Sequence, residues 1–330
     1  EDYFDGPSEA HSSGGEWRIE EQRSHWDILD HFQEAAVQAG IPKTSDFNTG
    51  DNEGVSYFKV NQKNGWRWNT SKGFLRPVQN RLSLKVETEA RAERILFEGK
   101  RATGVRYRQG DQTKTVHARA EVILSAGAIG SPQLLQLSGR GPGGLLQSLG
   151  IDVLLDAPKV GQNLQDHLQL RCAYKVHGTR TLNTVSASLW GKAKIALEYA
   201  ARRTGPMSMS PSQLGIFARS GPQAETADLE YHVQPLSLDA FGEDLHEFDA
   251  ITASVCFLRP EIRSHVNILS ADPFAAPEIA PNYLSAAKDQ KVAADSIRLT
   301  RKIMQQPALA RFRPEEFRPG SEVESEADLL

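Results

Sequence analysis

A short apolar run that leads into small residues, and then into a second apolar run, lies near the middle of this 330-residue chain. Its first part, Val122–Leu124, predicts a buried β-strand, and the next three residues, Ser125, Ala126 and Gly127, predict a turn with little side-chain bulk. Such a turn lets another backbone or a cofactor approach closely. The same residues would also suit tight packing of a strand on a helix in any α/β protein.

A helix is expected directly after this turn. Ser131 can accept a hydrogen bond from the first free amides, and Pro132 suits the first helical position because proline has no N–H to leave unpaired. Gly139 and Gly141 are expected to end the helix near Ser138. The whole pattern is strand, turn and helix N-terminus, which is a typical place for an anionic group to bind.

Composition excludes several classes of protein. The net charge of -4 and the isoelectric point near 6.2 give no reason to expect a nucleic-acid partner. No apolar run reaches the ~18 residues that a transmembrane helix needs. Cys172 and Cys256 lie in apolar alternating runs and are expected to be free, buried thiols in a reducing compartment. The nine histidines show no metal-ligand spacing, so no metal site is expected.

The first 80 residues combine a polar arm, a helix and an aromatic segment. Residues 1–22 are polar and rich in glycine and serine, which predicts a loop. A helix is predicted over residues 24–39, because its apolar residues recur at helical spacing: Leu29, Phe32, Ala36 and Ala39. Residues 45–70 are irregular and aromatic, and predict either a lid or a surface loop anchored by core aromatics.

Strands dominate the remainder of the chain. Alternation and Gly-containing gaps predict strands at residues 84–88, 93–97, 102–108, 113–118 and 151–155. Beyond residue 167, strands are expected at 168–176, 214–218, 229–233, 251–258 and 265–269, and helices at 186–203 and 286–305. Half-buried strands beside helices predict an α+β arrangement with one covered sheet face.

Several motifs resemble, in one fixed order, those of the glucose-methanol-choline (GMC) family of flavin oxidoreductases. The pattern Gly127-Ala-x-x-Ser-Pro-x-Leu-Leu-x-x-Ser-Gly-x-Gly141 is similar to the second signature of the family, with Arg140 where a branched aliphatic residue is usual. Residues 160–167, VGQNLQDH, resemble its Asn-Leu-x-Asp-His loop. Further matching stretches are Asp46–Asn48, Glu53–Phe58, Phe74–Pro77, Arg94–Gly99, Leu258–Glu261, Ser270–Pro273 and Pro281–Ser285. The choline-dehydrogenase-like and alcohol-dehydrogenase-like members are the nearest subgroup.

The resemblance implies a fold of the α/β and α+β classes. It comprises part of an FAD-binding doubly wound domain and a substrate domain whose antiparallel sheet is flanked by helices. We expect residues 1–80 to form an arm, a helix and a lid-like segment, and residues 81–167 to form part of the FAD-binding domain. Residues 168–285 would form the substrate-binding domain, and residues 286–330 a helix leading back towards the FAD domain.

The resemblance also implies a reaction. FAD would be the cofactor, and an alcohol (a CH–OH donor) would be oxidised to an aldehyde or ketone by hydride transfer to the flavin. The chain has no Gly-x-Gly-x-x-Gly after an N-terminal strand, and the catalytic histidine of the family is expected C-terminal to Leu330. We therefore interpret the chain as the central part of a longer enzyme, with no catalytic residue of its own and no turnover alone. The alternative is a folded, non-catalytic fragment or substrate-binding module without bound cofactor.

Candidate cofactor residues follow from the same resemblance. Ser125, Ala126 and Gly127 would contact the flavin nucleotide, and Ala92 would offer its backbone to the adenine. Three residues of the 160–167 loop, Asn163, Asp166 and His167, would fix the loop through backbone hydrogen bonds and pack near the flavin edge.

One candidate substrate residue lies on a predicted strand. Glu230, His232 and Gln234 share one face of the strand at residues 229–233. In the family this sheet roofs the substrate cavity, so His232 is the histidine best placed to meet substrate. A polar row that faces solvent is the ordinary alternative.

The expected partners are a small-molecule alcohol and an electron acceptor, either oxygen or a quinone. The sequence does not distinguish choline from short, aromatic or polyhydric alcohols. Choline would need an acidic residue or an aromatic cage, to which Trp66, Trp68, Trp190 and Phe257 could contribute. The expected location is cytoplasmic, free or peripheral to the inner membrane. An NAD-dependent dehydrogenase and a structural β-rich protein are further alternatives, but the missing fingerprint opposes the first and the ordered motifs oppose the second.

Overall fold

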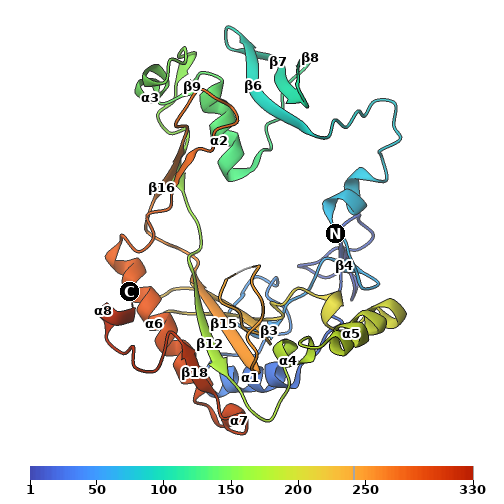
Figure 1. Ribbon diagram of the computed structural model, residues 1–330, viewed down its shortest axis with the longest axis vertical. Coiled ribbons are helices and arrows are strands. Elements are labelled where there is room, and N and C mark those ends of the chain that lie inside the picture. The colour runs from blue at the N-terminus through green and yellow to red at the C-terminus, as the bar shows by residue number, and fades with distance from the viewer. Residues whose placement is uncertain (241, 330) are drawn as a thin grey trace. The chain divides into compact units, whose positions relative to one another are not determined.

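The chain folds into two compact units in the computed structural model, which describes residues 1–240 and 242–329 (Figure 1). The first, here called the sheet unit, comprises Glu1–Arg81, His167–Arg259 and Ala287–Leu330. The second, here called the meander unit, comprises Leu82–Asp166 and Pro260–Ala286. No helix among the described residues is long and apolar enough to cross a membrane.

A six-stranded sheet in the order β18-β12-β15-β14-β13-β3 forms the centre of the sheet unit, and every neighbouring pair is antiparallel. Figure 1 shows segments from distant parts of the sequence side by side, with β18 in red, β12 in green and β15 in orange. The strands are β3 (Gly54–Tyr57), β12 (Gln169–Lys175), β13 (Leu214–Ala218), β14 (Leu229–Gln234), β15 (Ala250–Phe257) and β18 (Glu315–Arg318).

One face of this sheet packs against α1 (Asp27–Gln38) and α6 (Ala287–Met304) and carries the main hydrophobic core. Both helices present an apolar stripe, with Phe32 of α1 and Ile303 of α6 fully buried. Tyr231 projects into this core from β14, and its hydroxyl donates a hydrogen bond to the Ser296 carbonyl at 3.0 Å. Because side chains alternate along a strand, Glu230 and His232 project from the opposite face.

The sheet unit contains further strands and helices outside the six-stranded sheet. They are β1 (Asp2–Tyr3), β2 (Arg18–Ile19), β4 (Gln62–Lys63), β5 (Trp66–Arg67), the π-helix η1 (Ser71–Leu75), α4 (Leu182–Val185), α5 (Leu189–Arg202), the 3-10 helix η2 (Pro206–Ser208), α7 (Pro307–Ala310) and α8 (Glu326–Leu329). The side chain of Ser188 caps α5 by accepting a hydrogen bond from the Gly191 amide.

The meander unit joins two three-stranded sheets and two helices. One sheet is the meander β6 (Ala90–Glu98), β7 (Arg101–Gln109) and β8 (Gln112–His117), and the other has the order β11-β16-β17. Its remaining elements are α2 (Gly127–Leu137), β9 (Arg140–Gly141), α3 (Gly143–Ser148), β10 (Leu155–Asp156), β11 (Gln162–Leu164), β16 (Ser264–Asn267) and β17 (Glu278–Ala280).

Gln136 links α2 to two other segments of the meander unit through hydrogen bonds. Its side chain is fully buried on α2 and donates to the carbonyls of Val160 and Val266 at 3.2 and 3.3 Å. Its amide oxygen accepts a hydrogen bond from the Ile268 backbone at 2.9 Å. One glutamine therefore pairs backbone groups of two segments that would otherwise be buried without partners.

The prediction of a buried strand at Val122–Leu124 is wrong. These residues have no regular secondary structure, and Ile123 is 79% exposed. An extended run needs a neighbouring strand to pair its backbone groups, and no described residue pairs with this run. The helix start was also predicted wrongly, because α2 begins at Gly127 and contains Pro132 in its interior. The predicted end is confirmed, since the last helical residue is Leu137 and Gly139 is left-handed with φ 79.

Three further predictions are corrected. Residues 84–88 are exposed and irregular, because Glu89 adopts a left-handed conformation (φ 53) that separates them from β6. Of the strand expected at residues 151–155, only Leu155 pairs, within the two-residue β10. The segment at 45–70 is not wholly irregular, since β3 pairs with β13 and forms an edge of the six-stranded sheet.

The other long elements agree with the predictions. The helices expected at 24–39, 186–203 and 286–305 correspond to α1, α5 and α6. The strands expected at 214–218, 229–233, 251–258 and 265–269 correspond to β13–β16. Both cysteines are buried and neither forms a disulfide, and burial raises the pKa of the Cys172 thiol to about 12.

Candidate functional site

The face of the six-stranded sheet opposite the helices is polar. On β14 it carries Glu230 and His232, and the strand register sets Cys256 and Ser254 of β15 directly opposite them. The His232 Nε2 lies 3.3 Å from Glu230 Oε1, and the imidazole packs 5.5 Å from the Phe58 ring. The predicted sharing of one strand face by Glu230 and His232 is thus confirmed.

A cavity of about 610 Å³ opens beside His232 within the sheet unit. Its wall combines apolar, aromatic and polar side chains, among them Phe58, Gln62, Tyr199, Met207, Ser212 and His232. Elements far apart in sequence supply this wall: β4, α5, η2 and β14. A cavity of this size with a few convergent polar groups is a typical small-molecule site.

His167 lies just before β12, and its Nε2 is 3.2 Å from the Leu258 carbonyl oxygen. The sheet brings it near Glu230 and Cys256, so that one ligand atom of each residue lies within 4.8 Å of the others. Their separation in sequence gave no sign of this grouping. Because Glu230 pairs with His232, its carboxylate already has a charged or hydrogen-bonding neighbour.

The turn Ser125-Ala126-Gly127 lies in the meander unit, and all three residues are exposed. Ala126 is the N-cap of α2 and provides no side-chain cap, so the first backbone N–H groups of an 11-residue helix have no capping side chain. Small residues and free helix donors fit the phosphate end of a nucleotide. This property depends on the backbone at the start of α2, and it does not require the strand predicted at Val122–Leu124.

Ala92 lies on β6 beside a β-bulge, because the register with β7 shifts between Ala92 and Arg94. The extra residue, Glu93, is buried and forms ion pairs of 2.9 Å with Arg106 and with Arg108. The bulge therefore leaves Ala92 exposed at the edge of a well-anchored strand.

The loop that contains Asn163 and Asp166 is ordered by different contacts from those expected. Asn163 is left-handed, with φ 63, within β11. The carboxylate of Asp166 accepts a hydrogen bond from the Tyr283 hydroxyl, and this bond raises the pKa of Tyr283 to about 12. Asp166 belongs to the meander unit and His167 to the sheet unit, so the two residues have separate surroundings.

The comparisons identify the family of this chain. Residues 12–169 match the N-terminal part of the GMC oxidoreductase family, and residues 260–329 match its C-terminal part. Oxygen-dependent choline dehydrogenases of Burkholderia multivorans and Burkholderia pseudomallei are each 38% identical to the chain, and cover 98% of it. The chain belongs to the GMC oxidoreductase family. It spans 57% and 58% of the length of these two relatives.

Solved structures agree on the fold. An FAD-dependent oxidoreductase from Chaetomium thermophilum covers 98% of this chain with a TM-score of 0.86 and 22% identity, over 63% of its own length. The pyridoxine 4-oxidase from Mesorbium loti covers 97% of the chain with a TM-score of 0.82 and 24% identity, over 59% of its own length. The mixed α/β and α+β fold class expected from the sequence is thereby confirmed.

Proposed function

We propose that this chain is part of an FAD-dependent enzyme that oxidises an alcohol to an aldehyde or ketone. Family membership supports this proposal, as do relatives described as oxygen-dependent choline dehydrogenases. The observation that carries it is the cavity beside His232, whose wall combines polar groups with an apolar side. Such a wall can hold a small alcohol by its hydroxyl and by its carbon skeleton.

The residues proposed to hold FAD lie mainly in the meander unit. Ser125, Ala126 and Gly127 would offer backbone donors at the start of α2, and the exposed backbone beside Ala92 would meet the adenine. Asn163 and Asp166 would shape the neighbouring loop. His167 would fix the chain where it enters β12. When bound, FAD would supply the acceptor for the hydride that leaves the carbinol carbon.

His232 is proposed to bind the substrate hydroxyl. Glu230 fixes the orientation of the imidazole through Nε2, which leaves the other ring nitrogen to the substrate. Met207 and Phe58 would contact the carbon skeleton and exclude water from it. The proton acceptor for the hydroxyl is not assigned to any residue of this chain, and oxygen and a quinone both suit the role of final electron acceptor.

Flavin content tests this proposal first. The purified protein is expected to show flavin absorbance, alone or after addition of FAD, and an alcohol is expected to bleach it under anaerobic conditions. A protein that binds FAD but is not bleached by any alcohol would contradict the proposed reaction. A colourless protein that takes up no FAD would favour the alternative, a folded substrate-binding module, which the self-contained core of the sheet unit could support.

A further inference from the structure

The cavity beside His232 carries positive charge and no described negative charge. Lys59 and Arg67 lie in its wall, and no Asp or Glu lines it among the residues that the structure describes. The Lys59 ammonium is paired with the Glu21 carboxylate at 2.9 Å, so the Arg67 guanidinium is the main positive charge of the wall. Glu230, on the same sheet face, is engaged by His232. A cation that entered this cavity would meet the like charge of Arg67, and it would find no carboxylate in the wall to neutralise it.

Aromatic rings near the cavity are already occupied by cations of the chain itself. The Arg203 guanidinium lies over the rings of Trp66 and Tyr199, 4.3 and 4.9 Å from their centres. Trp66 also has the Lys72 ammonium 5.4 Å away, and Trp68 has the Lys63 ammonium 4.9 Å away. A quaternary ammonium would have to displace these groups, because each would compete for the same π-face.

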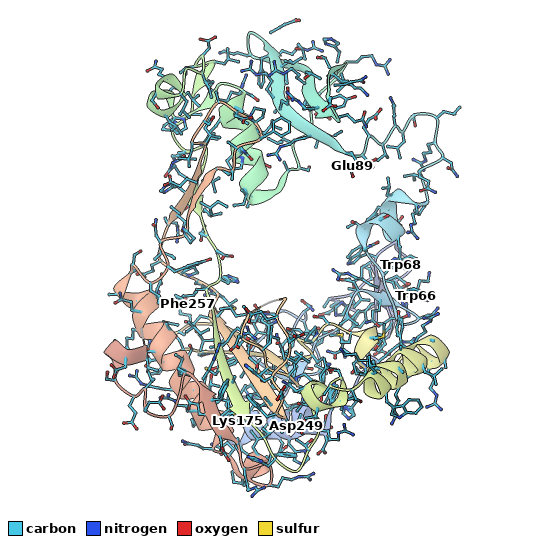
Figure 2. The ribbon with its side chains drawn as sticks, viewed as in Figure 1. Trp66, Trp68, Glu89, Lys175, Asp249 and Phe257 are labelled. Atoms are coloured by element: carbon cyan, nitrogen blue, oxygen red, sulfur yellow. The ribbon has the colours of Figure 1, made fainter. Side chains whose placement is uncertain are left out.

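The tryptophans do not form a cage with the other candidate aromatics. Figure 2 shows Trp66 and Trp68 close together and well away from Phe257. Phe257 has the Lys288 ammonium 5.8 Å from its ring centre. Trp190 is 81% exposed and is not among the residues that line this cavity. The four aromatics named as a possible choline cage are therefore separate or occupied.

The cavity wall contains a buried hydrogen-bond acceptor without a partner. The Gln62 amide nitrogen donates to the Ser208 carbonyl, but its oxygen is buried in the cavity wall with no partner. The Gln213 amide oxygen and the Ser254 hydroxyl are also buried and unpaired, but neither residue lines the cavity. An unsatisfied buried acceptor is destabilising, so a ligand that donates a hydrogen bond to the Gln62 oxygen offsets part of that cost.

We propose that the cavity selects an uncharged alcohol with a hydrogen-bond donor in addition to the reacting hydroxyl, such as a diol or polyol, and rejects quaternary ammonium alcohols. This inference rests on the proposed alcohol oxidation and narrows its substrate class. A trimethylammonium group has no N–H and would leave the Gln62 oxygen unpaired, in a cavity whose wall also holds the Arg67 guanidinium. A second hydroxyl would satisfy that oxygen.

The test uses two matched pairs of alcohols with the flavin-loaded protein. The first pair is choline and its carbon analogue 3,3-dimethylbutan-1-ol, which differ in charge but hardly in shape. The second pair is butan-1-ol and butane-1,4-diol, which differ by one hydroxyl. We expect kcat/KM to favour the uncharged analogue and the diol by about tenfold or more each, which corresponds to about 1.4 kcal/mol. Equal or higher kcat/KM for choline would overturn the inference.

Binding to the chain is measured separately by saturation-transfer NMR with the same four compounds. If no alcohol reduces the flavin, the proposed reaction fails, but stronger saturation transfer to the uncharged analogue and to the diol still supports the inference. Stronger transfer to choline contradicts it. The two failures are thus distinguishable.

A pair of variants locates the effect. Gln62→Leu removes the unpaired oxygen and is expected to abolish the preference for the diol, while Gln79→Leu, the same change at an exposed position that does not line the cavity, is expected to retain it. Gln62→Glu introduces a carboxylate and is expected to raise choline relative to its carbon analogue by about tenfold. If folded Gln62 variants keep the parent kcat/KM ratios for both pairs of alcohols, Gln62 does not determine substrate selectivity.

Discussion

The Arg203 guanidinium lies 4.3 Å from the centre of the Trp66 ring. The backbone of Arg203 is left-handed, and this conformation sets the direction in which the side chain leaves the chain. Arg203 is the C-cap residue of α5, with φ 58 and ψ 35, a conformation that ends the helix and turns the chain. The cap and the ring contact therefore depend on the same residue. The guanidinium occupies a face of Trp66 that could otherwise bind a cationic ligand.

Replacement of Arg203 should expose that aromatic face. Arg203→Asn keeps a residue type that tolerates the left-handed conformation, but it removes the cation over Trp66 and Tyr199. We expect choline to bind more tightly to this variant, measured by NMR titration, and stability to fall by about 1 kcal/mol. Arg203→Lys is the control, because it keeps a cation near the rings. Equal choline affinity in the two variants would contradict the role assigned to the guanidinium.

Flavin loading should depend on the space at the start of α2. Ala126→Leu adds an exposed side chain at the N-cap, so unfolding free energy should change by less than about 0.5 kcal/mol. If a nucleotide binds against this backbone, FAD uptake should fall by about tenfold or more. Gln147→Leu, exposed on α3, serves as the control for an added surface leucine. Normal flavin content in Ala126→Leu would rule out the proposed contact.

His232 should affect the reaction without affecting flavin uptake. His232→Gln is expected to lower kcat/KM for the best alcohol by about 10–100-fold, because the substrate hydroxyl loses a positioned partner. Glu230→Gln retains the imidazole but removes the negative charge 3.3 Å from its Nε2, so a smaller loss of kcat/KM is expected. If both variants keep the parent kcat/KM, His232 is a structural residue of the polar sheet face.

Close packing at Gly161 should be visible in stability. A Cβ atom there would lie 2.2 Å from the Val266 carbonyl oxygen and 2.6 Å from the Gln136 amide nitrogen, and the residue has φ 87. Gly161→Ala is expected to lower the free energy of unfolding by about 2–4 kcal/mol in urea titrations. Gly150→Ala has similar left-handed strain (φ 70) but open space around the added atom, so about 1 kcal/mol is expected. Equal losses would mean that backbone strain alone matters.

Long amphipathic elements could be predicted from sequence because each carries its own periodic signal. Phe32 and its neighbours on α1 occupy the stripe that helical spacing predicts, and Tyr231 and Val233 of β14 occupy the core face that alternation predicts. The run at Val122–Leu124 failed for the opposite reason. Its apolar composition predicts burial, but burial depends on partners that the composition of the run does not specify.

The site illustrates the same limit. The small turn at Ser125 and the polar face at His232 each carry a local signal, so both could be singled out from sequence. Gln62 could not, since its significance comes from an unpaired oxygen that only packing against Ser208 creates. The contact of Arg203 with Trp66 could not be predicted either, because the guanidinium comes from a distant part of the chain. The sequence suggests that Trp66 and Trp68 could form part of a cage, but in the structure cations of the chain itself already cover their rings.

Alkaline stability should report the buried Cys172 thiol. Burial raises its pKa from the ordinary 9.0 to about 12, so the folded chain keeps the thiol protonated at pH values where the unfolded chain releases the proton. The stabilisation is fully present below pH 9 and is lost as the pH rises towards 12. Cys172→Ala should cost about 1–2 kcal/mol at neutral pH through lost packing, but the variant should lose less stability between pH 9 and pH 11 than the parent chain. Urea titrations of both proteins at each pH give the comparison. Parallel curves over this range would mean that the folded thiol ionises at its ordinary pH and that Cys172 is more accessible than its burial indicates.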